Sequence, residues 1–184
     1  MENKIIFAGP VGSGKTTSIN SVSDIMVVGT EAKASDEVAL RKTNTTVAMD
    51  YGVLNLEDGM KVHLYGTPGQ DRFDFMWEIL SQGAMGLVIL IDSLRPDPMA
   101  DLETYVNAFR KSIISCGNAF VIGVTRTETN PQTDLLDRIH DRLMEQKLNV
   151  PILEIDGRNR EDVKQLLLAL LSLIDPSTRR TMNA

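Results

Sequence analysis

The chain has 184 residues, of which 42% are hydrophobic and 24% are charged, and its formal net charge is −6. This length and composition are typical of one soluble globular domain, and the negative charge argues against nucleic acid as the main partner. The lone cysteine, Cys116, excludes an intrachain disulfide and a zinc site built from several cysteines.

The N-terminal residues have the pattern of a strand, a phosphate-binding loop and a helix. A strand is expected over residues 4–8, and residues 9–16 match the pattern G-x-x-x-x-G-K-[ST] at every fixed position. Glycines let backbone N–H groups converge on phosphate oxygens, and the helix expected over 16–23 adds partial positive charge. Lys15 is predicted to reach the β- and γ-phosphates, and the hydroxyl of Thr16 is a candidate Mg²⁺ ligand. The sequence therefore predicts a site for a nucleotide polyphosphate.

A long polar connection over residues 30–46 precedes a predicted hairpin. Two runs typical of strands, 47–56 and 60–65, are separated by Glu57-Asp58-Gly59. An Asp-Gly pair between two such runs is a strong hairpin signal, so we expect these two strands to be antiparallel.

The rest of the chain alternates between buried strands and amphipathic helices. Continuous apolar runs predict strands over 87–91, 119–124 and 152–155. Apolar residues at 3–4 spacing predict helices over 102–113, 135–143 and 163–174, before Asp175-Pro176 and an expected flexible tail over 175–184. We expect an α/β fold of three layers, in which about six mostly parallel strands, one of them antiparallel, lie between helices. Residues 1–184 are expected to form a single domain.

Four segments follow predicted strands and should meet at one edge of the sheet, where open α/β sheets bind ligands. They are the phosphate loop and residues 66–70, 125–128 and 156–158. In this order and spacing, they resemble the Ras-like small GTPases, which are P-loop NTPases, over nearly the whole chain. Within that superfamily the chain is most similar to the bacterial branch related to the gliding-motility GTPases. The resemblance implies GTP or GDP and Mg²⁺ as cofactors, slow GTP hydrolysis, and a roadblock-type regulatory protein or other activating partner.

The resemblance implies two segments that respond to the γ-phosphate. Thr46, with Thr45 as the alternative, corresponds to the threonine that closes over Mg²⁺, although a polar strand edge also explains these residues. In the segment 65–73, Gly69 and Gln70 fit the pattern Asp-x-x-Gly-Gln, in which the glutamine orients the attacking water. Gly66 stands where the pattern has its aspartate, so weaker Mg²⁺ binding is expected.

The base-binding segment departs from the family's Asn-Lys-x-Asp. Thr125-Arg126-Thr127-Glu128 takes its place, and the carboxylate of Glu128 is expected to accept hydrogen bonds from guanine N1–H and the 2-amino group. The stem of Arg126 is expected to cover the base. Asp156 and Gly157 match the last segment in position only, with a backbone N–H near Gly157 as a candidate partner of guanine O6.

The sequence thus predicts three groups of site residues. The candidate catalytic residues are Lys15, Thr46 and Gln70, and the candidate metal ligands are Thr16 and Thr46. The candidate nucleotide-binding residues are Gly9, Gly12, Ser13, Gly14, Lys15, Thr16, Thr17, Gly69, Thr125, Arg126, Glu128, Asp156 and Gly157.

Several other residues have a structural as well as a functional interpretation. Arg41 and Arg72 are candidates for stabilising the transition state, although a surface role explains both. Trp77 is expected in the core, with a place on a partner-binding surface as the alternative. His63 and His140 are expected to be structural, and Asp92 to cap a helix or hold a loop.

A GTP-dependent molecular switch is the leading functional hypothesis. A nucleotide-binding module without hydrolysis and a P-loop ATPase or small-molecule kinase are the alternatives. The first residues lack the pattern of a signal peptide, no apolar run reaches about 18 residues, and no lipidation motif stands at either end. We therefore expect a cytoplasmic protein with no integral membrane segment.

Overall fold

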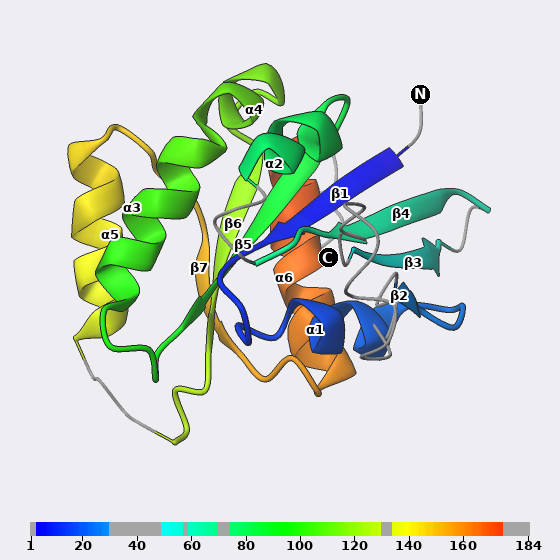
Figure 1. The fold of residues 1–184 in the computed structure, drawn as a ribbon, viewed down its shortest axis with the longest axis horizontal. Helices are drawn as coiled ribbons and strands as arrows, with labels where there is room; N and C mark the ends of the chain where they lie inside the picture. Colours follow the sequence, from blue (N-terminus) through cyan, green and yellow to red (C-terminus); the bar gives the residue numbers. More distant parts are fainter. Residues whose placement is uncertain (1–2, 30–48, 57–58, 70–73, 130–133, 175–184) are drawn as a thin grey trace, which may run out of the picture.

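We describe residues 3–29, 49–56, 59–69, 74–129 and 134–174 of a computed structural model of the chain. Seven strands form one sheet in the order β2-β3-β4-β1-β5-β6-β7, and helices cover both of its faces (Figure 1). The strands are β1 Asn3–Ala8, β2 Val28–Gly29, β3 Asp50–Asn55, β4 Lys61–Gly66, β5 Gly86–Asp92, β6 Phe120–Thr125 and β7 Ile152–Ile155. The helices are α1 Lys15–Val22, α2 Asp74–Ser81, α3 Pro98–Ala108, α4 Arg110–Ser115, α5 Leu135–Glu145 and α6 Arg160–Ile174.

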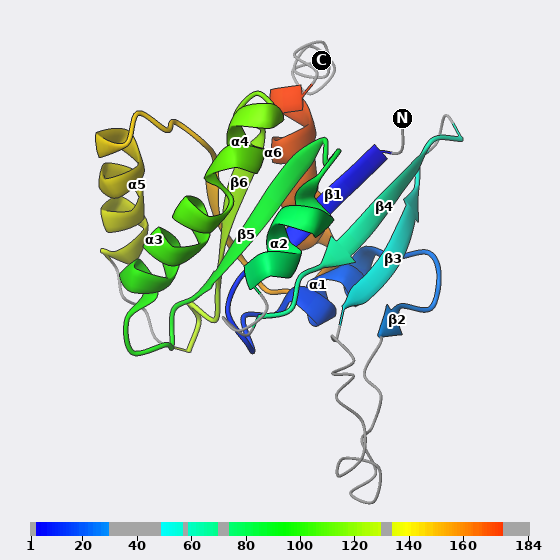
Figure 2. The same ribbon diagram turned by 45° about the horizontal axis from the view of Figure 1, so that its top comes forward.

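Two hydrophobic cores lie on opposite faces of the sheet. Successive side chains of a strand point to opposite faces, so Leu87, Ile89 and Ile91 of β5 pack with α2, α3, α4 and α5, whereas Val88 and Leu90 pack with α1 and α6. Figure 2 shows these two helical layers from a second direction. Because β5 is buried on both faces, its sequence is a continuous apolar run, which is why this strand is predictable.

The predicted hairpin and its antiparallel strand are confirmed. β3 pairs antiparallel with β4, and Gly59 has a φ of 82° at the turn, a conformation that glycine adopts without strain. The short edge strand β2, which pairs antiparallel with β3, was not predicted. Its two residues are too few to produce a sequence pattern.

The predicted helices are present, with two differences. The expected helix over 102–113 is divided at Phe109 into α3 and α4, and Phe109 has φ −92° and ψ 8°. Helix α2 was not predicted, because eight residues beside a glycine-rich segment give little periodicity. No helix within the described part of the chain has the length and apolar character needed to cross a membrane. The expected tail over 175–184 lies outside the described residues.

Trp77 of α2 lies in the core, and its alternative placement on a partner-binding surface is wrong. The side chain is 2% exposed, and its indole N–H donates to the carbonyl of Pro68 over 2.8 Å. Its ring packs against Tyr105 and Phe109, with centroids 4.8 and 5.6 Å away. Trp77 therefore anchors α2, and the segment that leads to Gly69, onto the helical layer above the sheet.

Trp77→Ala is expected to lower the free energy of unfolding by about 3–5 kcal/mol, because it opens a large cavity between α2 and α3 and leaves the Pro68 carbonyl unpaired. Chemical denaturation of the wild-type and variant proteins measures the difference. Ile79→Ala is the matched control on the same helix, because Ile79 is exposed and its loss should cost little. Equal midpoints for wild type and Trp77→Ala would contradict the core placement.

Candidate functional site

The phosphate loop lies between β1 and α1 and has the backbone geometry that its sequence predicts. Gly9, Gly12 and Gly14 have φ values of 144°, 80° and 97°, which other residues rarely adopt. A Cβ atom at Gly9 would lie 2.4 Å from the carbonyl oxygen of Leu90, so only glycine fits there. Thr16 and Thr17, at the start of α1, are exposed and accessible to a ligand. The loop and the helix N-terminus together form an anion-binding concavity.

Lys15 is held inside this loop. Its Nζ donates to the carbonyl oxygens of Gly9 and Pro10 over 2.7 and 2.8 Å. An ammonium group has three N–H donors, so one remains for a phosphate oxygen. Burial lowers the pKa of Lys15 to about 8, while the negative charge of Asp50 acts in the opposite direction. The positive charge is thus kept in a desolvated position where it interacts strongly with an anion.

The hydroxyl of Thr16 donates to Oδ2 of Asp50 over 2.7 Å. Asp50 is the first residue of β3 and lies directly opposite Gly66 in the antiparallel register. A Cβ atom at Gly66 would lie 2.8 Å from the same Oδ2 atom. The carboxylate of Asp50 therefore occupies the space beside Gly66, where the Ras-like pattern has the side chain of its aspartate. The sequence analysis identified the missing carboxylate but not this replacement.

Gly69 packs tightly against the phosphate loop. A Cβ atom at this position would lie 2.6 Å from the backbone nitrogen of Val11 and 2.9 Å from Nζ of Lys15. The close approach requires glycine and brings the chain after β4 to the place where a γ-phosphate is expected. The predicted roles of Thr45, Thr46, Gln70, Arg41 and Arg72 concern residues outside the described part of the chain.

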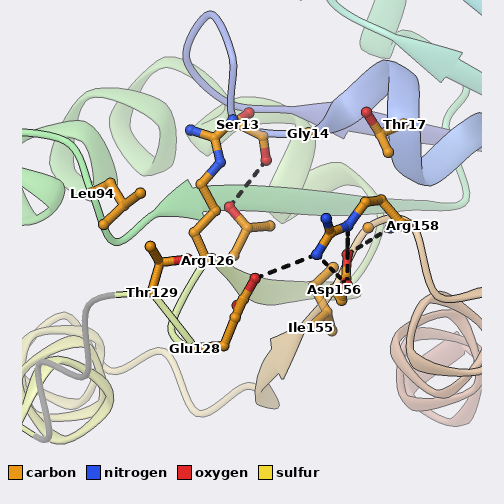
Figure 3. A pocket seen from close by; sticks show the side chains of 12 residues that line it. Ser13, Gly14, Thr17, Leu94, Arg126, Glu128, Thr129, Ile155, Asp156 and Arg158 are labelled. Carbon is orange, nitrogen blue, oxygen red and sulfur yellow. Dashed lines mark hydrogen bonds and ion pairs between the residues drawn. The ribbon is translucent and has the colours of Figure 1, made fainter.

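A cavity of about 380 Å³ continues from the phosphate loop along the carboxyl edge of the sheet (Figure 3). Its lining includes most of the residues predicted to bind the nucleotide beyond the phosphates, together with Arg158, which was not predicted. The lining residues are Ser13, Gly14, Thr17, Leu94, Thr125, Arg126, Glu128, Thr129, Ile155, Asp156, Gly157 and Arg158. The structure thus brings the loops after β1, β6 and β7 to one cavity, as the sequence analysis expects.

Arg126 and Thr125 connect the loop after β6 to the phosphate loop. Arg126 has a φ of 63° and donates to Oδ2 of Asp92 over 2.6 Å and to the carbonyl of Gly12 over 2.8 Å. The hydroxyl of Thr125 donates to the carbonyl of Ser13 over 3.2 Å. Asp92 is nearly buried and also accepts from the backbone N–H of Leu94, so its predicted loop-holding role is confirmed. These bonds fix the loop after β6 against the phosphate loop.

Three charged side chains form a cluster at the far end of the cavity. Arg158 makes several hydrogen bonds to Asp156, including 2.8 Å from Nε to Oδ1 and 2.8 Å from Nη2 to Oδ2. Its Nη2 atom also lies 3.6 Å from Oε1 of Glu128. Hydrogen bonds from Arg158 lower the pKa of the Asp156 carboxyl, so this group is ionised at neutral pH. The carboxylate of Glu128 therefore lies beside the guanidinium of Arg158 and also lines the cavity.

Comparison with known proteins agrees with this geometry. A model of the family described as "Conserved hypothetical ATP binding protein" matches residues 27–179. The chain belongs to this family of conserved hypothetical ATP binding proteins. The match begins after the phosphate loop, so the loop motif and the family match are separate observations that both indicate nucleotide binding.

Individual relatives place this member of the ATP-binding family among proteins with a Ras-like P-loop GTPase fold. An uncharacterized protein of Methanocaldococcus jannaschii is 34% identical over 102 residues, which cover 55% of this chain and 58% of that protein. The Ras-related protein SEC4 of Candida albicans is 27% identical over 88% of this chain and 83% of its own length. The crystal structure of the G domain of the T. maritima FeoB iron transporter covers 95% of this chain and all of that chain, with a TM-score of 0.61 and 15% identity.

Proposed function

We propose that the chain is a guanine-nucleotide-dependent molecular switch that hydrolyses GTP to GDP slowly. The observation that carries the proposal is the contact between Thr16 and Asp50 beside Lys15 and Gly69. This contact joins the phosphate loop to β3, the strand that follows the expected switch segment around Thr46. Gly69, which packs against the phosphate loop, begins the second expected switch segment. Any change at the γ-phosphate would act on both segments at once, which is how nucleotide switches work.

The residues at this position fit Mg²⁺. A hydroxyl oxygen and a carboxylate oxygen lie 2.7 Å apart at the foot of the phosphate loop, and both are oxygen ligands of the kind that Mg²⁺ takes. Thr16 and Asp50 would hold the ion, together with Thr46 if the segment before β3 closes over it. Bound there, Mg²⁺ would supply positive charge that offsets the negative charge of the nucleotide phosphates.

The chain's own residues supply positioning and charge. Lys15 has one N–H donor left for the phosphates, and the backbone N–H groups of the loop surround them. In this proposal Gly69 would donate its N–H to the γ-phosphate, and Gln70 would orient the attacking water. No arginine is assigned to stabilise the transition state, because Arg41 and Arg72 lie outside the described residues and Arg126, which contacts the phosphate loop, is paired with Asp92. We therefore propose slow turnover that a partner accelerates.

The setting proposed for this switch follows from the resemblance to the bacterial gliding-motility branch. It includes bacterial cytoplasmic signalling or polarity and a roadblock-type regulatory protein or another activating partner. A single domain over residues 1–184 would carry the activity. Nucleic acid has no place in this proposal, because the chain carries a net charge of −6.

An ATP-binding protein without guanine preference is the second candidate, and the family description favours it. Competition against a fluorescent GDP analogue distinguishes the two, with GDP, GTP, ADP and ATP as competitors, in Mg²⁺ and in EDTA. We expect GDP and GTP to compete at least 100-fold more strongly than ADP and ATP, because Glu128 would repel N1 of adenine. Equal or stronger competition by ADP would refute the guanine proposal and favour an ATPase or kinase.

The hydrolysis step is tested separately by single-turnover phosphate release from wild type and Gln70→Ala. A slower rate in the variant is the expected result. Equal rates would remove Gln70 from the mechanism, and no release over hours in either protein would favour a binding module that does not hydrolyse nucleotide.

A further inference from the structure

Arg158 is an exposed arginine at the base end of the cavity, directly after Asp156 and Gly157. Its side chain is 73% exposed, yet its guanidinium is held in one orientation by Asp156 and lies 3.6 Å from Glu128 (Figure 3). Asp156 and Glu128, the two carboxylates beside it, line the same cavity as Arg158. Its guanidinium is therefore positioned to contact a ligand in the cavity.

The hydrogen-bond donors of Arg158 are only partly used. Nε donates to both carboxylate oxygens of Asp156, and Nη2 faces Asp156 and Glu128. Among the described residues, no acceptor is found for Nη1. A guanidinium carries five N–H donors in a rigid plane, so the two N–H groups on Nη1 remain for a ligand in the cavity.

The pair of Arg158 and Glu128 matches guanine and not adenine. The Watson–Crick edge of guanine presents an acceptor, O6, followed by two donors, N1–H and the 2-amino group. Arg158 offers donors next to the acceptor oxygens of Glu128. Adenine presents a donor and then an acceptor, so both of its groups would face a protein group of the same kind, and buried mismatches of this type are strongly disfavoured.

We propose that Arg158 is a specificity-determining residue, which donates from its guanidinium to O6 of guanine while Glu128 accepts from N1–H and the 2-amino group. Asp156 is then a positioning residue that fixes the plane of Arg158. The inference rests on the proposed guanine-nucleotide function. It differs from the expectation that a backbone N–H near Gly157 reads O6, because it assigns that contact to a side chain.

The test measures each base contact with a matched nucleotide. In 6-thio-GDP a sulfur atom, a weak acceptor, replaces O6, whereas IDP lacks only the 2-amino group. Wild type is expected to bind GDP about tenfold more tightly than 6-thio-GDP, and Arg158→Ala is expected to bind the two almost equally. The ratio between GDP and IDP should be the same in both proteins, because it reports on Glu128. Arg138→Ala removes an arginine from an exposed ion pair on α5 and should behave as wild type.

Different outcomes separate this inference from the function on which it rests. If wild type prefers GDP to ADP but binds GDP and 6-thio-GDP equally, or if Arg158→Ala keeps the wild-type ratio, the role of Arg158 is refuted and the guanine switch stands. If wild type binds ADP as tightly as GDP, both are refuted. Arg158 is mostly exposed, so the variant should fold, and an unchanged thermal midpoint verifies that binding and not folding is compared.

Discussion

Asp50→Ala is expected to weaken GDP binding in the presence of Mg²⁺ by about 10- to 100-fold, which is the usual cost of removing a group that holds or supports a metal ion. The reason is the position of its carboxylate, 2.7 Å from the hydroxyl of Thr16. In EDTA the wild-type and variant proteins should bind GDP with similar affinity. Titration with a fluorescent GDP analogue at several Mg²⁺ concentrations measures the difference.

Moving the carboxylate from β3 to β4 tests whether Mg²⁺ binding depends on the position of the carboxylate in space and not on the strand that carries it. Asp50 and Gly66 are opposite each other on β3 and β4, and a Cβ atom at Gly66 would lie 2.8 Å from Oδ2 of Asp50. Gly66→Asp alone should therefore clash and destabilise the protein. The double variant Asp50→Gly/Gly66→Asp places a carboxylate in nearly the same space from the neighbouring strand, and we expect it to recover most of the Mg²⁺-dependent affinity.

Asp134→Ala is the control for the loss of a negative charge, because Asp134 is exposed and its carboxylate lies 4.0 Å from the guanidinium of Arg138 on α5. It should bind GDP as wild type does. If Asp50→Ala retained the full Mg²⁺ dependence, or if it lost affinity equally with and without Mg²⁺, the carboxylate would have no part in the metal site.

The parts of the molecule that the sequence predicts are those specified by local patterns. The phosphate loop requires glycines at fixed spacing before Lys15 and Thr16, and the apolar run of β5 reflects burial on both faces. Both are properties of a few consecutive residues, so they can be recognised without tertiary information. The same holds for the convergence of the strand ends at one edge, which follows from parallel topology.

The replacement of the missing aspartate could not be predicted in this way. Gly66 and Asp50 are 16 positions apart in the sequence, and their proximity depends on the register between β3 and β4. A shift of one residue in that register would point the Asp50 side chain to the other face of the sheet. Arg158 is similar, because its relation to Glu128 depends on how two separate loops fold. Side-chain contacts of this kind are set by the tertiary structure.

Lys15→Met is expected to abolish tight nucleotide binding. The same change removes the free-energy penalty of burying the Lys15 charge in the folded protein. At pH 7 the loss of the ammonium group should weaken GDP binding about 100-fold, because a charge-assisted contact with the phosphates disappears. In wild type the affinity should also fall as the pH rises above 8, since the pKa of Lys15 is about 8 and the neutral amine attracts phosphate poorly. Titrations between pH 7 and pH 9 measure this decrease, which should reach about tenfold at pH 9.

The stability of the nucleotide-free protein should change in the opposite direction. The pKa of Lys15 is about 8 in the folded state and near its ordinary value of 10.5 in the unfolded state. Between these values the unfolded chain binds more protons, so this residue makes the free energy of unfolding rise with pH. Below pH 8 the buried charge costs about 3 kcal/mol. Lys15→Met has no such group, so its stability relative to wild type should be greatest at pH 7 and should decline by pH 10.5.

Urea denaturation of wild type and Lys15→Met at pH 7, 8.5 and 10 tests this expectation. The difference between the two free energies of unfolding removes the contribution of the titrating groups that both proteins share. Lys164→Met serves as the control, since Lys164 lies on the surface of α6 beside Glu161 and should alter neither binding nor the pH dependence. A difference between wild type and Lys15→Met that did not vary with pH would mean that Lys15 is not desolvated. Its positive charge is therefore retained for binding phosphate at the expense of stability, which is the pattern expected of a functional site.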